Sequence, residues 1–214
     1  MDQCIREDKL MKLTWYGHSC FGLYSADGSV IFDPYSPASV PGISLPELTA
    51  DAVICSHFHG DHGYEQGVKL TGEKPRFSVT RLDTFHDGVR GALRGKNTVS
   101  AVDAEKMRIV HMGDIGHMLS SKQLEKLGSV DVLMIPVGGH YTIDARTARE
   151  IVDALKPRIV IPMHYRGEGF GYDVISTADE FVSLSENVRY YDTNELEIFP
   201  DTPKTTAVLK CPVR

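Results

Sequence analysis

The stretch His57-Phe58-His59-Gly60-Asp61-His62 gathers three of the chain's nine histidines and one aspartate within six residues. Only Ser56 separates it from Ala52-Val53-Ile54-Cys55, a continuous apolar run that predicts a strand buried on both faces. We therefore expect the cluster at the C-terminal end of a strand, where a loop turns several side chains towards one point. Imidazole nitrogen and carboxylate oxygen suit zinc, manganese or iron(II). Because no cysteine pair lies nearby, a catalytic metal site with open positions is favoured over a structural zinc site or a solvated histidine-rich loop.

The composition of the 214-residue chain is typical of one globular domain, with 42% hydrophobic and 24% charged residues. We expect a polar lead-in at residues 1–11 and a single domain over residues 12–214. No apolar run is long enough for a membrane span, and the start lacks the apolar centre of a secretory signal. The net charge of −6 argues against long nucleic acid as a partner. The four cysteines form no C-x-x-C pair, which favours reduced thiols in a cytoplasmic protein.

Short runs rich in β-branched and aromatic residues predict strands along most of the chain. The expected strands are Lys12–Tyr16, Cys20–Tyr24, Ser29–Phe32, Ala52–Cys55, Arg76–Thr80, Thr98–Val102, Met107–His111, Asp131–Val137, Arg158–Pro162, Val188–Tyr191, Leu196–Phe199 and Thr206–Leu209. Helical spacing and helix-end signals predict helices at Ser120–Leu127, Asp144–Leu155 and Thr177–Leu184. Strand runs followed by β-helix-β units indicate a layered α/β sandwich rather than a barrel.

The pattern H-x-H-x-D-H resembles the signature of the metallo-β-lactamase superfamily, and further motifs extend the resemblance from about Lys12 to the end of the chain. The residues that match the superfamily's other motifs are Asp33 in Ile31–Pro34, His86 in Thr84–Asp87, Asp114 in His111–Asp114 and His164 in Pro162–Tyr165. Three segments are similar to the branch that contains ascorbate-6-phosphate lactonase-like proteins: Gly17–Phe21, Pro136–Thr142 and Pro162–Tyr165. The resemblance implies a four-layer αβ/βα sandwich.

The resemblance also implies a ligand set for two divalent metal ions, with zinc favoured and manganese or iron as alternatives. It assigns His57, His59 and His86 to the first ion, Asp61, His62 and His164 to the second, and Asp114 to a bridge between them. Asp33 is expected to accept the second N–H of a ligating histidine and so to fix its tautomer. A turn residue before Pro34 is the alternative interpretation of Asp33.

The third ligand of the first ion is the least defined position, because His111 and His117 compete with His86. If Met107–Asp114 is extended, His111 and Asp114 point to opposite faces, which argues against His111 as a ligand. His117 lies in a glycine-containing loop and stays an alternative. Pocket roles also stay open for a group of polar residues in loops, namely His18, Arg90, Arg94 and Arg166.

Two divalent ions about 3.5–4 Å apart would share a bridging water, whose pKa falls towards about 7, so that hydroxide forms at neutral pH. With the charges of Asp61 and Asp114 and the hydroxide included, the centre stays at about +1 and favours anionic substrates. We predict a hydrolase that acts on a small anionic ester or lactone, with Asp61, His140 and Tyr141 as catalytic residues. The alternatives are a phosphodiesterase acting on a lipid or nucleotide, redox chemistry at a di-iron centre, and a non-catalytic metal-binding module. A homo-oligomer is also possible on sequence grounds.

Overall fold

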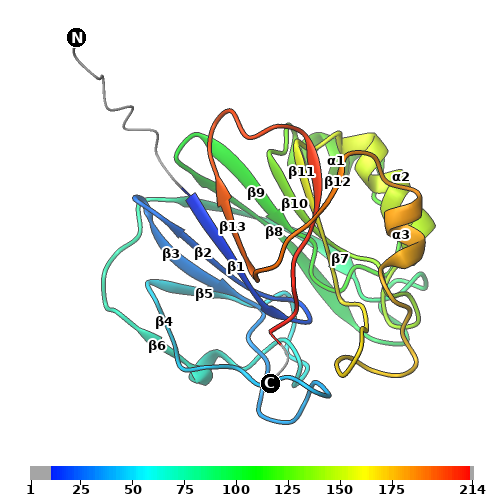
Figure 1. Cartoon of the computed structure of the whole chain (residues 1–214), viewed down its shortest axis with the longest axis horizontal. Coiled ribbons are helices and arrows are strands. Elements are labelled where there is room, and N and C mark those ends of the chain that lie inside the picture. Colours follow the sequence, from blue (N-terminus) through cyan, green and yellow to red (C-terminus); the bar gives the residue numbers. More distant parts are fainter. Residues whose placement is uncertain (1–10, 213–214) are drawn as a thin grey trace.

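Two mixed β-sheets lie face to face in the computed structural model, which describes residues 11–212 (Figure 1). The first sheet has five strands in the order β13-β1-β2-β3-β5. Their bounds are Met11–Gly17 (β1), Cys20–Ser25 (β2), Gly28–Phe32 (β3), Ala52–Ile54 (β5) and Glu195–Ile198 (β13). Strands β13, β1, β2 and β3 pair antiparallel, whereas β5 pairs parallel with β3. Strands β3 and β5 therefore end at the same edge of the first sheet.

The second sheet has seven strands in the order β12-β14-β11-β10-β9-β8-β7. Their bounds are Ser78–Phe85 (β7), Lys96–Ala104 (β8), Met107–His111 (β9), Val132–Pro136 (β10), Ile159–Met163 (β11), Val188–Tyr190 (β12) and Thr205–Val208 (β14). Strand β8 is antiparallel to both β7 and β9, and the other pairs are parallel. Strands β7, β9, β10 and β11 thus run in one direction, and the loops that follow them meet at one edge.

The main hydrophobic core joins the inner faces of the two sheets. Trp15 and Phe32 of the first sheet belong to the same buried cluster as Val99 and Met134 of the second. Burial of apolar surface at about 25 cal/mol per Å² is the dominant favourable term for such a core. Three helices cover the outer face of the seven-stranded sheet (Figure 1): α1 (Ser121–Leu127), α2 (Ala145–Leu155) and α3 (Asp179–Ser183).

The helices begin and end close to the positions that the sequence predicted. The Ser120 side chain accepts a hydrogen bond from the backbone N–H of Gln123, and the Gln123 side-chain oxygen accepts one from the backbone N–H of Ser120, which completes a capping box at α1. The Asp144 carboxylate accepts from the backbone N–H of Thr147 at 2.9 Å and caps α2. The predicted third helix is present but shorter than Thr177–Leu184.

The expected four-layer sandwich is confirmed, with one difference in its fourth layer. Over the outer face of the first sheet the described residues form no α-helix. A two-stranded sheet, β4 (Leu48–Ala50) with β6 (Val68–Leu70), lies there with the 3₁₀ turn η1 (Glu65–Gly67). Residues of this layer pack with Ile31 and Tyr35 in a second buried cluster. Loops and short strands therefore cover the outer face of the first sheet, as helices cover the outer face of the second.

Two strand predictions were wrong in detail. The run Ala52–Cys55 was expected to be buried on both faces, but β5 is an edge strand and both Ala52 and Val53 are half-buried. The strand expected at Arg76–Thr80 is β7, which continues to Phe85 because its pairing with β8 extends that far. Apolar runs and turn residues do not reveal such long-range pairing.

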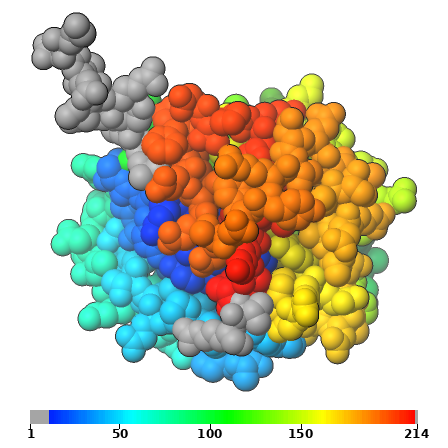
Figure 2. Space-filling model, in the orientation of Figure 1, coloured from blue at the N-terminus to red at the C-terminus, as the bar shows by residue number. Residues whose placement is uncertain are grey.

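The C-terminal segment connects the two sheets. Strand β13 pairs with β1 in the first sheet, whereas β12 and β14, on either side of it in sequence, pair with each other in the second. In Figure 2 this orange and red segment crosses the face between the blue N-terminal strands and the yellow part of the chain. The tail therefore holds the sandwich together at the side seen in that view.

Three further predictions concern membrane spans, the cysteines and the N-terminal lead-in. None of the helices in residues 11–212 is both long and apolar enough to cross a membrane. Cys20, Cys55 and Cys211 carry free thiols. Cys4 and nearly all of the expected lead-in at residues 1–11 lie outside the described residues.

We predict that Ile151→Ala will lower the free energy of unfolding by about 2–5 kcal/mol, because it removes a fully buried side chain of α2 from the core. The control is Glu150→Ala on the same helix, where the side chain is exposed and the change should stay within about 0.5 kcal/mol. Urea unfolding followed by circular dichroism measures both. Equal losses would mean that α2 does not depend on its buried face.

Candidate metal centre

The structure brings all seven predicted metal ligands together at the edge where strands of both sheets end. Each belongs to at least one group of side chains whose ligand atoms lie within 4.8 Å of one another. The predicted ligands on the loop after β5 are His57, His59, Asp61 and His62, and those that follow β7, β9 and β11 are His86, Asp114 and His164. The common direction of the strands explains why residues so far apart in sequence meet.

One carboxylate lies at the centre of the cluster. Asp114 Oδ2 is 3.2 Å from His62 Nε2, 3.2 Å from His86 Nε2 and 3.1 Å from His164 Nε2. His86 belongs to the predicted first ligand set, whereas His62 and His164 belong to the second. Asp114 therefore contacts both sets, as a bridging ligand must.

The donor atoms fit divalent metal ions. Four buried atoms form no well-aligned hydrogen bond among the described residues, although two of them lie close to Asp114 Oδ2: Nε2 of His57, His62 and His164, and Oδ1 of Asp114. Leaving a buried polar atom unsatisfied costs about 1–3 kcal/mol, so a cluster of such atoms indicates a missing partner. Two ligands about 2.1 Å from one tetrahedral ion lie about 3.4 Å apart. The separations of 3.1–3.2 Å around Asp114 are close to that value.

Asp33 orients two of these histidines from the end of β3. Its Oδ2 lies 2.8 Å from His62 Nδ1 and accepts the Ser56 hydroxyl at 2.6 Å, while Oδ1 accepts the Ser56 backbone N–H at 2.6 Å. Because the Ser56 hydroxyl donates to Asp33, its oxygen is free to accept the Nδ1 proton of His57, 2.9 Å away. Both rings then turn Nε2 towards the cluster, which is the arrangement that a metal ligand needs.

The electrostatics of the cluster favour a cation. Although burial opposes a charge on His62, the carboxylates of Asp114 and Asp33 raise its pKa well above the ordinary value. Burial likewise opposes ionisation of Asp114, but His164 and His62 hold the pKa of its carboxyl group well below the ordinary value. For His57, burial lowers the pKa to about 3, so its ring is neutral at pH 7. The negative charge that stabilises a proton on His62 would equally stabilise a metal ion at its Nε2.

Asp114 is held in place by a residue that the sequence did not single out. The backbone N–H of Asp114 donates to Asn97 Oδ1 at 2.8 Å, and Asn97 Nδ2 donates to Thr84 Oγ1 and to the Met112 carbonyl oxygen. Gly113 has φ +54, and a Cβ there would lie 2.4 Å from Asn97 Oδ1. Glycine is therefore required between the end of β9 and Asp114.

His18 joins the second ligand group from the turn between β1 and β2. Its Nε2 lies 3.4 Å from Asp61 Oδ2, its ring centroid is 4.0 Å from that of His164, and its side chain is fully buried. Burial is the main cause that lowers the pKa of His18 to about 4, so the ring is neutral at pH 7. His18 and His164 both have positive φ, at 52°, as does Asp33 at 43°. Such strained backbone commonly marks functional sites.

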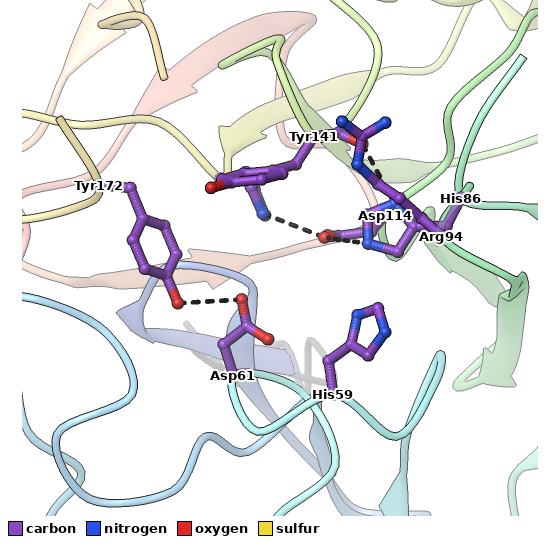
Figure 3. Close-up of a pocket in the computed structure, with 8 residues that line it drawn as sticks. His59, Asp61, His86, Arg94, Asp114, Tyr141 and Tyr172 are labelled. Atoms are coloured by element: carbon purple, nitrogen blue, oxygen red, sulfur yellow. Dashed lines mark hydrogen bonds and ion pairs between the residues drawn. The ribbon is translucent and has the colours of Figure 1, made fainter. Parts of the chain in front are cut away.

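A cavity of about 270 Å³ opens over the cluster (Figure 3). Its lining comprises His59, Asp61, His86, Arg94, Asp114, Tyr141, His164 and Tyr172. The Tyr172 hydroxyl lies 3.2 Å from Asp61 Oδ2 and 2.6 Å from the Ser39 carbonyl oxygen. Burial raises the pKa of Tyr172 above its usual range, so the phenol stays protonated and can donate. Nothing in the sequence around Tyr172 indicated this position.

The three histidines considered for the third ligand position of the first ion lie in different surroundings. His86 Nδ1 lies 3.1 Å from the Tyr141 carbonyl oxygen, which directs His86 Nε2 towards Asp114. His111 Nε2 bonds the Ser19 carbonyl oxygen, and His117 Nε2 accepts the Phe85 N–H, so neither belongs to a ligand group in the described part of the chain.

Two other candidate residues lie outside the cavity lining. His140 is exposed and packs on the ring of Tyr141, with centroids 4.5 Å apart. Arg166 is also exposed, and its Nε donates to the Ile175 carbonyl oxygen.

We predict that Asp33→Asn will weaken divalent-metal binding about 10–100-fold. The NH₂ group that replaces one carboxylate oxygen cannot accept a hydrogen bond from His62 or Ser56. Competition against a chromogenic chelator measures the affinity. The control is Asp51→Asn, since that carboxylate accepts the Ser29 backbone N–H at the other end of β3. If both variants bind metal like the wild type, Asp33 does not orient the ligands.

Comparison with known proteins agrees with the family that the histidine motif indicates. The Beta-lactamase superfamily domain matches residues 12–164. A UPF0173 protein of Pyrococcus abyssi is 30% identical over 189 residues, covering 75% of this chain and 86% of that protein. A UPF0173 metal-dependent hydrolase of Thermoplasma acidophilum is 26% identical, covering 85% of this chain and 93% of that protein.

A solved structure shows the same fold. A protein of Thermotoga maritima, described as a candidate Zn-dependent hydrolase of the metallo-β-lactamase superfamily, has a TM-score of 0.76 and 32% identity. The similarity covers 93% of this chain and 98% of that one. The chain belongs to the metallo-β-lactamase superfamily, among its metal-dependent hydrolases.

Proposed function

We propose that the chain hydrolyses a small anionic ester or lactone with the help of two divalent metal ions. The observation that carries the proposal is the contact of one carboxylate, Asp114, with histidines of both ligand sets beneath a cavity of about 270 Å³. A cavity of this size suits a small molecule better than a polymer. The net charge of −6 also disfavours long nucleic acid.

The proposed ligands are those implied by the superfamily motif. His57, His59 and His86 would hold one ion, Asp61, His62 and His164 the other, and Asp114 both. When bound, such a pair supplies hydroxide at neutral pH and stabilises negative charge that develops on the substrate. Zinc is the favoured metal, since the similar Thermotoga maritima protein is described as Zn-dependent, and manganese and iron(II) are the alternatives.

Tyr141 is the proposed proton donor to the leaving group. Its side chain lines the cavity, and its hydroxyl has no hydrogen-bond partner among the described residues, whereas the Tyr172 hydroxyl is engaged with Asp61 and Ser39. Tyr172 would instead hold Asp61 in position. His140 was an alternative donor, but its exposed position beside Tyr141 makes it the weaker candidate.

A lactone or ester is favoured over a phosphodiester because of the motifs shared with lactonase-like proteins, Gly17–Phe21 and Pro136–Thr142. A phosphodiesterase acting on a lipid or nucleotide is the second candidate function. A cytoplasmic location and a homo-oligomer stay predictions from the sequence.

We expect purified wild-type protein without a tag to contain about two equivalents of zinc, manganese or iron. His59→Ala and Asp114→Ala should each lose metal, because they remove one ligand and the shared ligand. His117→Ala is the control, since that ring bonds backbone groups outside the cluster. Elemental mass spectrometry measures the content. Absence of metal in the wild type, even after reconstitution with each ion, would contradict the hydrolase proposal.

We expect Tyr141→Phe to slow hydrolysis of a lactone or alkyl ester about 10²-fold and to slow a para-nitrophenyl ester much less. An alkoxide needs a proton in order to leave, whereas para-nitrophenolate does not. The control is Tyr190→Phe, because that residue is 69% exposed and does not line the cavity. Steady-state kcat values for both substrate types are compared. Equal losses on the two substrates would remove Tyr141 from proton donation.

A further inference from the structure

We propose that Arg94 binds an anionic group of the substrate, a carboxylate or a phosphate remote from the bond that is broken, and that Asp87 positions Arg94 for this role. This inference rests on the proposed hydrolase function. It adds a recognition site that is separate from the metal ligands and lies on the opposite wall of the cavity from Tyr172 (Figure 3).

The loop that carries Arg94 is organised around one carboxylate. Asp87 Oδ1 accepts the backbone N–H groups of Val89 and Gly91 at 2.9 and 2.8 Å. Asp87 Oδ2 accepts those of Leu93 and Arg94 at 3.0 and 2.8 Å. Four donors on one carboxylate leave the loop little freedom, because each bond fixes a different part of it.

The same loop is clamped from its other side. Only 4% of Asp87 is exposed, and the backbone N–H of Gly116 bonds the Phe85 carbonyl oxygen at 2.9 Å. A Cβ on Gly116 would lie 2.3 Å from the Asp87 backbone nitrogen, so the two loops pack without space for a side chain. The loop that carries Arg94 is therefore held by the Asp87 carboxylate on one side and by this close packing on the other.

Arg94 presents an unpaired guanidinium to the cavity. Its side chain lines the cavity and lies over the Tyr141 ring, 5.5 Å from the centroid. No ion pair with a carboxylate is formed by Arg94 in residues 11–212. A guanidinium held on an aromatic ring has a fixed fork of N–H donors, which matches the oxygens of a carboxylate or phosphate.

The neighbouring Arg90 provides a matched comparison. It lies on the same loop, is exposed and does not line the cavity. A general attraction between the loop's positive charge and anions would involve both arginines equally. Recognition inside the cavity requires Arg94 alone.

The test uses the metal-loaded protein and two para-nitrophenyl esters of equal chain length, the glutarate half-ester, which carries a free carboxylate, and the neutral pentanoate. The wild type should prefer the glutarate ester in kcat/KM. Arg94→Met should reduce this preference about 10–100-fold, as expected for the loss of a charged hydrogen bond. Arg94→Lys should lose part of it, because an ammonium lacks the fork. Arg90→Met should keep the wild-type preference.

The role of Asp87 is tested with Asp87→Asn, which replaces one acceptor oxygen by an NH₂ group that faces two N–H donors. Its KM for the glutarate ester should rise about 10-fold with a smaller change in kcat. A purely structural role would reduce kcat for both esters alike. That result, or an unchanged preference in Arg94→Met, would overturn the proposal.

A binding measurement separates this proposal from the hydrolase proposal. Calorimetry compares glutarate with butyrate, and phosphonoacetate with acetate, in wild type and Arg94→Met. The second anionic group should add affinity only where Arg94 is present, and the pair with the larger loss identifies carboxylate or phosphate as the preferred group. If no ester is hydrolysed but this loss occurs, the anion site stands and the proposed function fails. If neither pair loses affinity, the anion site is rejected.

Discussion

The buried carboxylate of Asp33 is the interaction on which the site depends. It is fully buried, and burial of a charge is costly unless every oxygen finds a donor. Ser56 supplies two donors and His62 a third. The same bonds connect the end of β3 to the loop after β5 and fix two imidazole rings. The free energy that compensates the buried charge is thus obtained only when the ligand loop has its functional shape.

The second sheet contributes to the site because several of its strands run in the same direction. Because β7, β9 and β11 run the same way, the residues after them, His86, Asp114 and His164, reach one point. The same edge also carries the strained backbone of His164. A hydrophobic core between two sheets is rigid enough to maintain such strain, and the first sheet brings its own loop to the same place.

The sequence was sufficient to predict which side chains gather at the site and insufficient to predict what holds them there. The spacing H-x-H-x-D-H and the later motifs identified side chains that the structure collects, because those residues are defined by chemical type. Asn97, Ser56 and Tyr172 act through contacts with residues far away in the chain, and no local pattern marks them. The edge position of β5 escaped for the same reason, since an apolar run does not reveal how many neighbours a strand has. The helices were found because helical spacing and helix ends are local features, and in α1 and α2 the capping residues Ser120 and Asp144 each bond within three residues.

Arg94 in the cavity wall and most of the predicted ligands are supported by different parts of the chain. Arg94 depends on the loop around Asp87, and Tyr172 depends on Ser39 and Asp61. The predicted ligands His57 and His62 depend instead on Asp33 and Ser56, whereas His86 bonds the Tyr141 carbonyl oxygen in the cavity wall. A change in the loop around Asp87 can therefore alter which substrate is held without disturbing Asp33 or Asn97. This separation explains how one scaffold can serve several substrates: the chemistry is set by buried carboxylates, while the choice of substrate is set by loops over the cavity.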